Sequence, residues 1–300
     1  MSIQSVGLLG ADGKLGPAIL HGLLKSNFKV TVLKRQSSKS KDDYPSNVNI
    51  VKVRDDFAVE AVASAIRGLD AVIVTIKGSL TEVQYKLAQA CVQSGVRRFI
   101  PADFGSCDSS TQWAQDLVPL FKHKTELRSR LMRLAEQNAD FTWTSLVCGH
   151  FFDWSPEFLH VWIKEQKADV LDDGETKWST STFTRIAEAT VSILLKPEVT
   201  ANQVLYVQSF CISQNEVIRS FEKATASKWQ ITKFDSKEYE KEQKAKADGG
   251  DLEAVEDLVW LLGALDANWE TRDGFAMEKL GLKQDESLDE VVQRIVQENQ

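Results

Sequence analysis

A glycine-rich turn near the N-terminus constrains the fold of this chain more than any other feature. A short apolar run over residues 6–9 leads directly into a G-x-x-G-x-x-G turn made by Gly10, Gly13 and Gly16, and an amphipathic helical pattern begins near Lys14. Glycines let a backbone approach a pyrophosphate closely, and the N–H groups at a helix N-terminus bind its charge. The turn therefore predicts a strand–turn–helix unit that binds a dinucleotide, and the alternative is a purely structural turn.

The first half of the chain repeats this alternation of strands and helices. Apolar, β-branched runs predict strands over residues 6–9, 29–33, 48–53, 71–76, 98–100 and 142–147. Helical spacing of apolar residues marks 15–24, 59–66 and 83–92, and glycines follow the last two. Strands that alternate with helices are typical of a parallel sheet covered on both faces. We expect an α/β protein with a Rossmann-type doubly wound parallel sheet.

The second half loses this alternation after about Trp154. Its pattern predicts helices over residues 157–165, 185–195 and 215–226, a strand over 204–207 that joins the sheet, and a mixed-charge helical stretch over 235–257. We expect residues 1–154 to form the NADP-binding domain, with a return contribution from about 183–226. Residues 155–182 and 227–300 would then form a smaller, mainly helical, substrate-binding lobe.

Charge, cysteine spacing and histidine spacing exclude several classes of protein. The 36 Lys and Arg against 43 Asp and Glu give a formal charge of −7, which makes nucleic acid an unlikely direct partner. No apolar run approaches the length of a membrane span. The four cysteines form no C-x-x-C pair, no leader pattern precedes the glycine turn, and the four histidines lack metal-ligand spacing. We expect a reduced, cytoplasmic protein without a metal.

The end of the second predicted strand indicates which dinucleotide binds. An NAD enzyme places an acid there, whereas this chain has Lys34 and Arg35, which suit the 2′-phosphate of NADP(H). The alternative is a solvated basic strand end. Asp12 would repel phosphates, so we expect it to cap the following helix. The other cofactor contacts expected from topology are Lys14 and Leu15 in the turn, Asp56 and Phe57 after the third strand, and Thr75, Ile76 and Lys77 after the fourth.

Two further blocks carry a family resemblance. No tyrosine has a lysine four residues later, so the Tyr-x-x-x-Lys pair of typical short-chain dehydrogenases is absent. Instead, residues 95–105 read GVRRFIPADFG and residues 121–128 read FKHKTELR. With the glycine turn, these blocks resemble the NmrA-like and isoflavone reductase-like family of atypical short-chain dehydrogenases, most closely its fungal secondary-metabolism members. Ala102 and Asp103 depart from the Ser-Glu pair that is common there.

The resemblance implies roles for particular residues. It places the family's catalytic lysine on Lys124, which would bind or protonate the atom that gains negative charge, and the alternative is a solvated helix lysine. It also places Ala102, Asp103, Phe104, Lys124, Cys148 and Gly149 beside the cofactor, and His150, Phe151 and Trp154 around the substrate, for which Trp113 and Trp178 are further candidates. His150 is either a second proton donor or a wall residue. Trp154, Phe158 and Trp162 fall at i, i+4 and i+8, which predicts an aromatic stripe on one helical face beside the pocket, and a core role is the alternative.

The function that the resemblance implies is an NADPH-dependent oxidoreductase. It would reduce a polarised C=C or C=N bond of an aromatic or alkaloid-like secondary metabolite, and a cyclisation of the reduced product in the same cavity is a variant of this hypothesis. Two alternatives remain at this point. One is a non-catalytic NADP-sensing regulator of the NmrA type, and the other is a scaffold that keeps the fold without catalysis.

Overall fold

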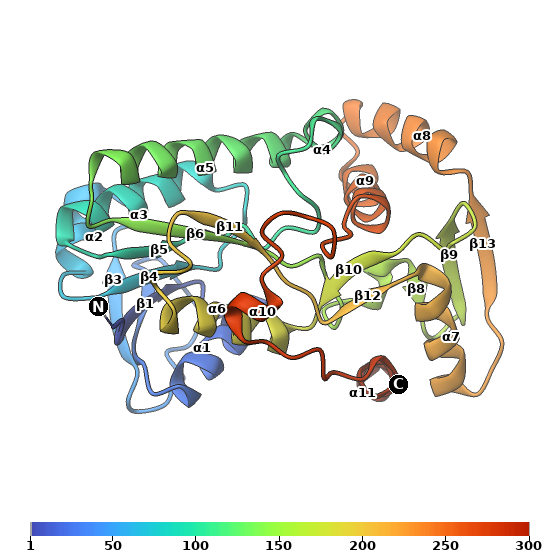
Figure 1. Ribbon diagram of the computed structural model, residues 1–300, viewed down its shortest axis with the longest axis horizontal. Helices are drawn as coiled ribbons and strands as arrows, with labels where there is room; N and C mark the ends of the chain where they lie inside the picture. The colour runs from blue at the N-terminus through green and yellow to red at the C-terminus, as the bar shows by residue number, and fades with distance from the viewer. Residues whose placement is uncertain (1, 300) are drawn as a thin grey trace.

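A seven-stranded parallel sheet forms the centre of the larger lobe in the computed structural model, which describes residues 2–299 (Figure 1). The strands are β1 (Ser5–Leu9), β2 (Lys29–Arg35), β3 (Asn49–Val53), β4 (Ala71–Val74), β5 (Arg98–Ile100), β6 (Thr142–Val147) and β11 (Gln203–Tyr206). Their order is β11-β6-β5-β4-β1-β2-β3, and every neighbouring pair is parallel. The order reverses between β1 and β4, so a crevice opens at the carboxyl ends of these two strands.

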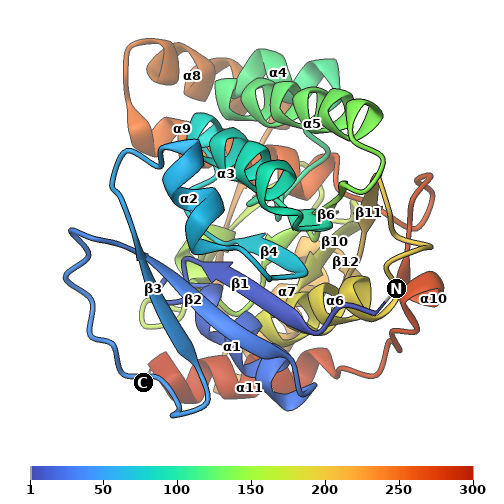
Figure 2. The same ribbon diagram turned by 90° about the vertical axis from the view of Figure 1, so that its left-hand side faces the viewer.

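Helices cover both faces of this sheet (Figure 2). One face carries α2 (Val59–Ala65), α3 (Thr81–Ser94) and α5 (Pro119–Gln137), and the other carries α1 (Gly16–Lys25) and α6 (Phe183–Leu195). Two separate apolar clusters fill the spaces between the sheet and these layers. The prediction of a doubly wound parallel sheet is confirmed, including the late strand that adds to its edge as β11.

The smaller lobe contains two three-stranded sheets as well as helices. One sheet has the order β12-β10-β7 and the other the order β13-β9-β8. The strands are β7 (His150–Phe151), β8 (Val161–Trp162), β9 (Lys167–Leu171), β10 (Trp178–Ser181), β12 (Phe210–Ile212) and β13 (Gln230–Phe234). The remaining helices are α4 (Gln112–Leu117), α7 (Gln214–Thr225), α8 (Ser236–Asp248), α9 (Leu252–Leu265), α10 (Met277–Leu280) and α11 (Leu288–Asn299). In the described chain, no helix combines the length and the apolar character needed to cross a bilayer.

The predicted helix over residues 157–165 is wrong. The chain forms only a short 3₁₀ turn over Pro156–Leu159, and His160 then adopts a left-handed backbone conformation with φ 56°. A residue in that conformation ends a helix, and β8 follows at once. Trp162 therefore does not lie on one helical face with Trp154 and Phe158. The mixed-charge stretch over 235–257 is helical, but Gly249 and Gly250 divide it between α8 and α9.

Candidate active site

The glycine turn links β1 to α1 at the carboxyl edge of the central sheet. Gly10 has φ 99°, and a Cβ at this position would lie 2.8 Å from the carbonyl carbon of Thr75. A Cβ on Gly16 would lie only 2.1 Å from the carbonyl oxygen of Gly10. Both positions therefore require glycine, which keeps the turn tight against the start of α1. Within the same turn Lys14 is exposed and Leu15 is buried.

Asp12 does not cap α1, so that prediction is wrong. No side chain caps this helix, and its N-terminal N–H groups stay available for an anion. The Asp12 carboxylate instead accepts hydrogen bonds from the hydroxyls of Ser40 and Tyr44 and lies 3.1 Å from the Nζ of Lys34. Partial burial acts to raise the pKa of Asp12, but these contacts outweigh it and the pKa is lowered.

Lys34 and Arg35 have different surroundings at the end of β2. The Lys34 ammonium is buried, lies 2.8 Å from an oxygen of Asp42 and donates to the carbonyl of Lys41 at 2.9 Å. Burial alone would lower the pKa of Lys34, but its acidic partners raise it, so the side chain is charged and already paired. Arg35 is exposed, and its guanidinium makes no ion pair within residues 2–299. Asp42 and Tyr44 lie in the β2–β3 loop, and no sequence signal identified them as partners of Lys34.

The other predicted cofactor contacts lie at the ends of β3 and β4. Asp56 forms an ion pair with Arg54 at 2.8 Å and is exposed, whereas Phe57 packs into the core. Thr75 donates its hydroxyl to the carbonyl of Leu9 at 3.1 Å, which ties the end of β4 to the end of β1. Ile76 is half-buried and Lys77 is exposed immediately afterwards. These residues share one sheet edge with the glycine turn, as strand topology predicts.

Lys124 extends from the second turn of α5 to the carboxyl ends of β4 and β5. Its side chain is buried, and its ammonium donates to the carbonyl oxygen of Asp103 and lies 3.7 Å from the Asp103 carboxylate. A Cβ on Gly78 would lie 3.1 Å from the Cε of Lys124, so the glycine after β4 makes room for the lysine. Ala102 and Phe104 are buried on either side of Asp103. Lys124 thus lies against residues 102–104, the segment that the sequence predicted to contact the cofactor.

A buried ion-pair network continues from Lys124 into the smaller lobe. The Nε of Arg128 lies 2.6 Å from Asp103, a second Arg128 nitrogen lies 3.7 Å from Asp108, and Arg272 lies 2.9 Å from the same Asp108. Burial acts to raise the pKa of Asp103, but Arg128 and Lys124 outweigh it and lower the pKa. Arg128 is part of the block that contains Lys124, so the sequence carried a signal for it. Arg272 had none.

His150 is buried under α9 at the start of the smaller lobe. Its Nε2 lies 3.4 Å from the carbonyl oxygen of Trp260, and its ring makes edge contacts with Phe158 and Trp178. A Cβ on Gly263 would lie 1.9 Å from the same Nε2, so only glycine fits beneath the ring. Burial lowers the pKa of His150 to about 4, which leaves the ring neutral near pH 7. These surroundings favour the wall role over that of a proton donor.

The remaining predicted pocket residues are spread over a wider region. Phe151 packs against Phe183 and Trp154, with ring centroids 5.4 and 6.3 Å apart, and Trp154 is partly exposed. Trp113 donates its indole N–H to Glu240 on α8 at 3.0 Å. Cys148 is buried, and Gly149 has φ 73° where a Cβ would overlap the carbonyl of Ser179. The structure groups His150 with Trp178 and places Trp113 at the contact with α8.

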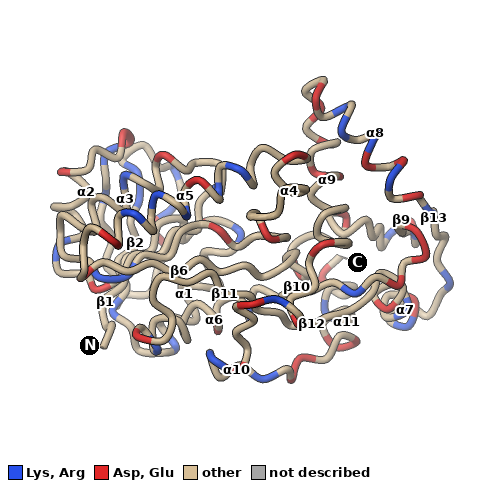
Figure 3. Tube along the Cα trace, turned by 45° about the horizontal axis from the view of Figure 1, so that its top comes forward, with Lys and Arg blue, Asp and Glu red and all other residues tan. Residues whose placement is uncertain are grey.

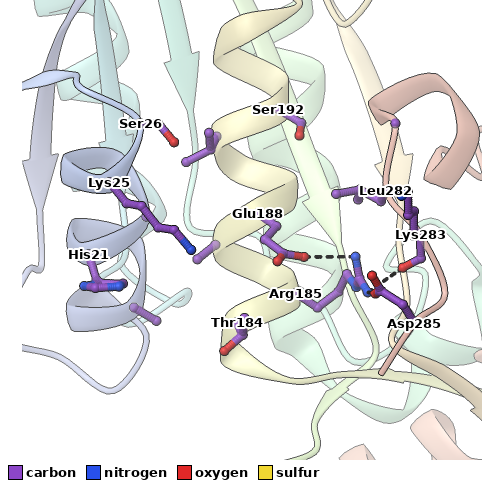
Figure 4. A pocket seen from close by; sticks show the side chains of 15 residues that line it. His21, Lys25, Ser26, Thr184, Arg185, Glu188, Ser192, Leu282, Lys283 and Asp285 are labelled. Atoms are coloured by element: carbon purple, nitrogen blue, oxygen red, sulfur yellow. Dashed lines mark hydrogen bonds and ion pairs between the residues drawn. The ribbon is translucent and has the colours of Figure 1, made fainter. Parts of the chain in front are cut away.

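A groove of about 600 Å³ opens elsewhere, between α1, α6 and the segment after α10 (Figure 4). The predicted site residues do not line it. Along this groove the guanidinium of Arg185 forms ion pairs with Glu188, at 3.0 Å, and with Asp285, at 3.1 Å. Figure 4 shows these side chains between α6 and the segment after α10. The groove is therefore separate from the candidate active site at the carboxyl edge of the sheet.

The NmrA-like family matches residues 3–247. The chain belongs to the NmrA-like family. Oxidoreductase aprR of Aspergillus flavus is 33% identical over 240 residues, which cover 79% of each chain. Oxidoreductase poxI of Penicillium oxalicum is 28% identical over 304 residues, which cover 96% of this chain and 92% of the relative.

Solved structures show the same fold as this NmrA-like protein. The complex of leucoanthocyanidin reductase with NADPH from Vitis vinifera has a TM-score of 0.76 and 18% identity, and the match covers 97% of this chain and 99% of the other. A structure described as AtPrR2 with NADP⁺ and (+)pinoresinol has a TM-score of 0.76 and 19% identity, and covers 98% and 99%. At these identities the likeness concerns the fold. Together with the named relatives, family membership makes the chain an oxidoreductase of the isoflavone reductase-like type.

Proposed function

We propose that the protein is a cytoplasmic, NADPH-dependent oxidoreductase that reduces a polarised C=C or C=N bond of an aromatic or alkaloid-like secondary metabolite. The observation that carries the proposal is the buried ammonium of Lys124 at the sheet edge that also holds the glycine turn. Structures of the same fold hold NADPH, or NADP⁺ with (+)pinoresinol, which supports both the cofactor and the class of ligand.

The residues at the sheet edge fit a dinucleotide. The turn from Gly10 to Gly16 brings backbone N–H groups to the uncapped N-terminus of α1, where a pyrophosphate would bind. Arg35 presents an unpaired guanidinium for the 2′-phosphate. Lys34 holds the β2–β3 loop through Asp42 and the glycine turn through Asp12. Thr75 holds the ends of β1 and β4 together beneath the site. When bound, NADPH supplies the hydride.

Lys124 would act on the atom that accumulates negative charge during the reduction. Its ammonium donates to a backbone carbonyl in the structure, so a substrate oxygen or nitrogen that reaches this position would compete for the same hydrogen bond. A preorganised donor in a water-poor site stabilises developing charge more strongly than the same donor in water. The Asp103 carboxylate also lies 3.7 Å from the lysine, and Arg128 holds that carboxylate in place.

The test uses a pair of lysine variants on the same helix. Lys124→Gln should lower NADPH consumption with electron-poor aromatic enones and iminium compounds by about a hundredfold or more, because a positioned proton donor contributes on this scale. Lys122→Gln is the matched control, since Lys122 is exposed two residues earlier, and its rate should be unchanged. NADPH affinity should be the same in wild type and both variants.

Two outcomes would reject the catalytic role. If Lys124→Gln turns over as fast as wild type, the lysine does not take part in the chemistry. If wild type binds NADPH and consumes none across the panel, the NADP-sensing regulator becomes the better account. NMR spectroscopy of the products would separate simple reduction from reduction followed by ring closure, because ring closure converts the reduced compound into an isomer of the same mass with one additional ring.

A further inference from the structure

A cleft of about 680 Å³ opens in the smaller lobe between the segment from Trp154 to Trp162 and the helices α8 and α9. In Figure 1 these elements lie at the right, away from the glycine turn. Trp154 lines the cleft together with Phe158 and Trp162, the other two residues of the predicted aromatic stripe, whereas none of the predicted cofactor contacts does. The cleft is thus a second hollow, distinct from the edge of the central sheet where Lys124 lies.

Aromatic side chains form the walls of this cleft. The rings of Trp154 and Phe158 lie 5.2 Å apart on one side, and those of Phe234 and Tyr239 lie 5.1 Å apart where β13 leads into α8. Trp154 is 40% exposed, which is unusual for so large an apolar side chain. Aromatic surface that faces an open hollow is stabilised when a flat apolar body covers it.

The charge of the cleft is strongly negative. Its lining includes six carboxylates, which belong to Glu157, Asp169, Glu242, Glu253, Glu256 and Asp257. Only Lys246 and His160 oppose them, and Lys246 is paired with Glu242 at 2.7 Å. Glu253 and Glu256 are exposed on successive turns of α9, and their carboxylates have no hydrogen-bond or ion-pair partner within residues 2–299. Figure 3 shows acidic and basic residues alternating along the neighbouring α8.

His160 pairs with the two innermost carboxylates. Its Nδ1 lies 3.1 Å from Asp169 and its Nε2 lies 3.2 Å from Asp257, so both ring nitrogens face acceptors and both carry protons. Burial acts to lower the pKa of His160, but these two contacts outweigh it and raise the pKa. The ring stacks on Trp260 with centroids 3.6 Å apart. One imidazolium balances one of these two carboxylates, and Glu157, Glu253 and Glu256 add negative charge for which the described residues supply no cationic partner.

We propose that the cleft binds a small organic cation with an aromatic body, such as a protonated or quaternary amine. The aromatic body would lie between the Trp154–Phe158 and Phe234–Tyr239 pairs, and the cationic nitrogen would face Glu253 and Glu256. Aromatic faces and carboxylates both attract organic cations, whereas the same charges repel an anion of equal shape. The proposal does not rest on the reductase reaction, because binding alone tests it.

One wall of the cleft contacts His150, the buried histidine near the candidate active site. Phe158 lines the cleft, and its ring lies 5.4 Å from that of His150. The ring of Trp260 stacks on that of His160, and the carbonyl oxygen of Trp260 lies 3.4 Å from the Nε2 of His150. A ligand in the cleft therefore lies one side-chain layer from His150.

Calorimetric titration with three naphthalene probes tests the proposal, without any dinucleotide present. The probes are 1-naphthylmethylammonium, its neutral N-acetyl derivative and the anion 1-naphthylacetate, which share one ring system and differ in charge. The cation should bind saturably and about tenfold more tightly than the neutral compound, with an affinity that falls as salt rises. The anion should bind most weakly.

Variants locate the charge that the cation recognises. Glu253→Gln/Glu256→Gln should weaken the cation by about threefold to tenfold and leave the neutral probe unchanged. Glu278→Gln/Glu290→Gln removes the same number of charges from exposed positions on α10 and α11 and is the control. Trp154→Ala should weaken both the cation and the neutral compound. Equal affinity for cation and neutral probe, no saturable heat with the cation, or an unchanged affinity in Glu253→Gln/Glu256→Gln would overturn the proposal.

Discussion

His150 shows at the residue scale how burial sets the state of a side chain. The ring is surrounded by α9, Phe158 and Trp178, and its pKa falls to about 4. His160 lies in the same lobe and behaves in the opposite way, because Asp169 and Asp257 hold its proton. The pKa values of two histidines ten residues apart in the sequence are therefore shifted in opposite directions, and the difference follows from their surroundings.

This contrast predicts opposite effects on the pH dependence of stability. Because His150 is neutral in the folded protein, the unfolded state binds more protons than the folded state once the pH drops below 6.5. This residue therefore lowers the free energy of unfolding by about 2 kcal/mol between pH 7.5 and pH 5. His150→Gln should therefore lose less stability than wild type over this range. Urea unfolding at both pH values measures the difference.

His160 supplies the matched comparison for that experiment. Its raised pKa gives a stabilising contribution to the free energy of unfolding. This contribution is fully present below pH 6.5 and is lost as the pH rises through the pKa of His160 in the folded state. His160→Gln should accordingly lose more stability than wild type on going from pH 7.5 to pH 5. The account fails if His150→Gln and His160→Gln shift the pH dependence in the same direction.

Two helical glycines predict opposite responses to alanine. Gly263→Ala would put a Cβ 1.9 Å from the His150 ring and should lower the free energy of unfolding by about 2 kcal/mol through overpacking. Gly22→Ala in α1 would make only ordinary 3.4 Å contacts with Ala187 and Val191 and should raise it by about 0.5–1 kcal/mol. Thermal and chemical unfolding measure both. A Gly263→Ala protein as stable as wild type would mean that His150 does not pack on α9.

Single residues show which parts of the site the sequence could predict. The three glycines and Lys124 belong to blocks with fixed spacing, and the structure brings both blocks to one sheet edge. The role of Asp12 could not be predicted, because its partners Lys34, Ser40 and Tyr44 depend on how the β2–β3 loop folds back. Arg272, which joins the ion pairs of Arg128 through Asp108, comes from a segment far along the chain, as does Gly263 beneath His150.

At the scale of elements, local periodicity predicted the parallel sheet well and the smaller lobe poorly. The central strands are apolar almost throughout and lie between helices, so the pattern has one simple interpretation. Strands β7 and β8 have two residues each, and β8 follows a left-handed residue at His160. Aromatic residues at helical spacing around them imitate a helix. In the structure β7 pairs with β10 and β8 pairs with β9, and these pairings determine the conformation of the segment.

The β2–β3 loop is the element with the clearest single anchor. Lys34 holds it through the carbonyls of Ser40 and Lys41 and the carboxylate of Asp42. Lys34→Met should remove about 1 kcal/mol of local stability, since the carboxylates are partly solvated, and amide exchange over residues 36–47 should become roughly fivefold faster.

A neighbouring lysine gives the control for the loop experiment. Lys29→Met changes an exposed lysine at the start of the same strand, and its loop should exchange at the wild-type rate. Hydrogen–deuterium exchange followed by mass spectrometry resolves this segment. Unchanged exchange in Lys34→Met would show that other contacts hold the loop.

At the scale of the whole molecule, the buried ion pairs connect the two lobes. Lys124 and Arg128 on α5 hold Asp103 after β5, and Asp108 joins Arg128 to Arg272 beyond α9. Removing one member of a buried pair leaves the other uncompensated, so such a network resists change more than a surface pair. The candidate catalytic lysine therefore belongs to the contact that fixes the smaller lobe against the sheet.

The central claim is that this NmrA-like oxidoreductase uses NADPH, and thermal unfolding with NADPH, NADP⁺, NADH and NAD⁺ at equal concentrations tests it most directly. A ligand that binds only the folded state raises the melting temperature according to its affinity. The account predicts that NADPH stabilises at least as well as NADP⁺ and that both forms of NAD are far weaker. Equal stabilisation by NADH, or stabilisation by the oxidised forms alone, would contradict it.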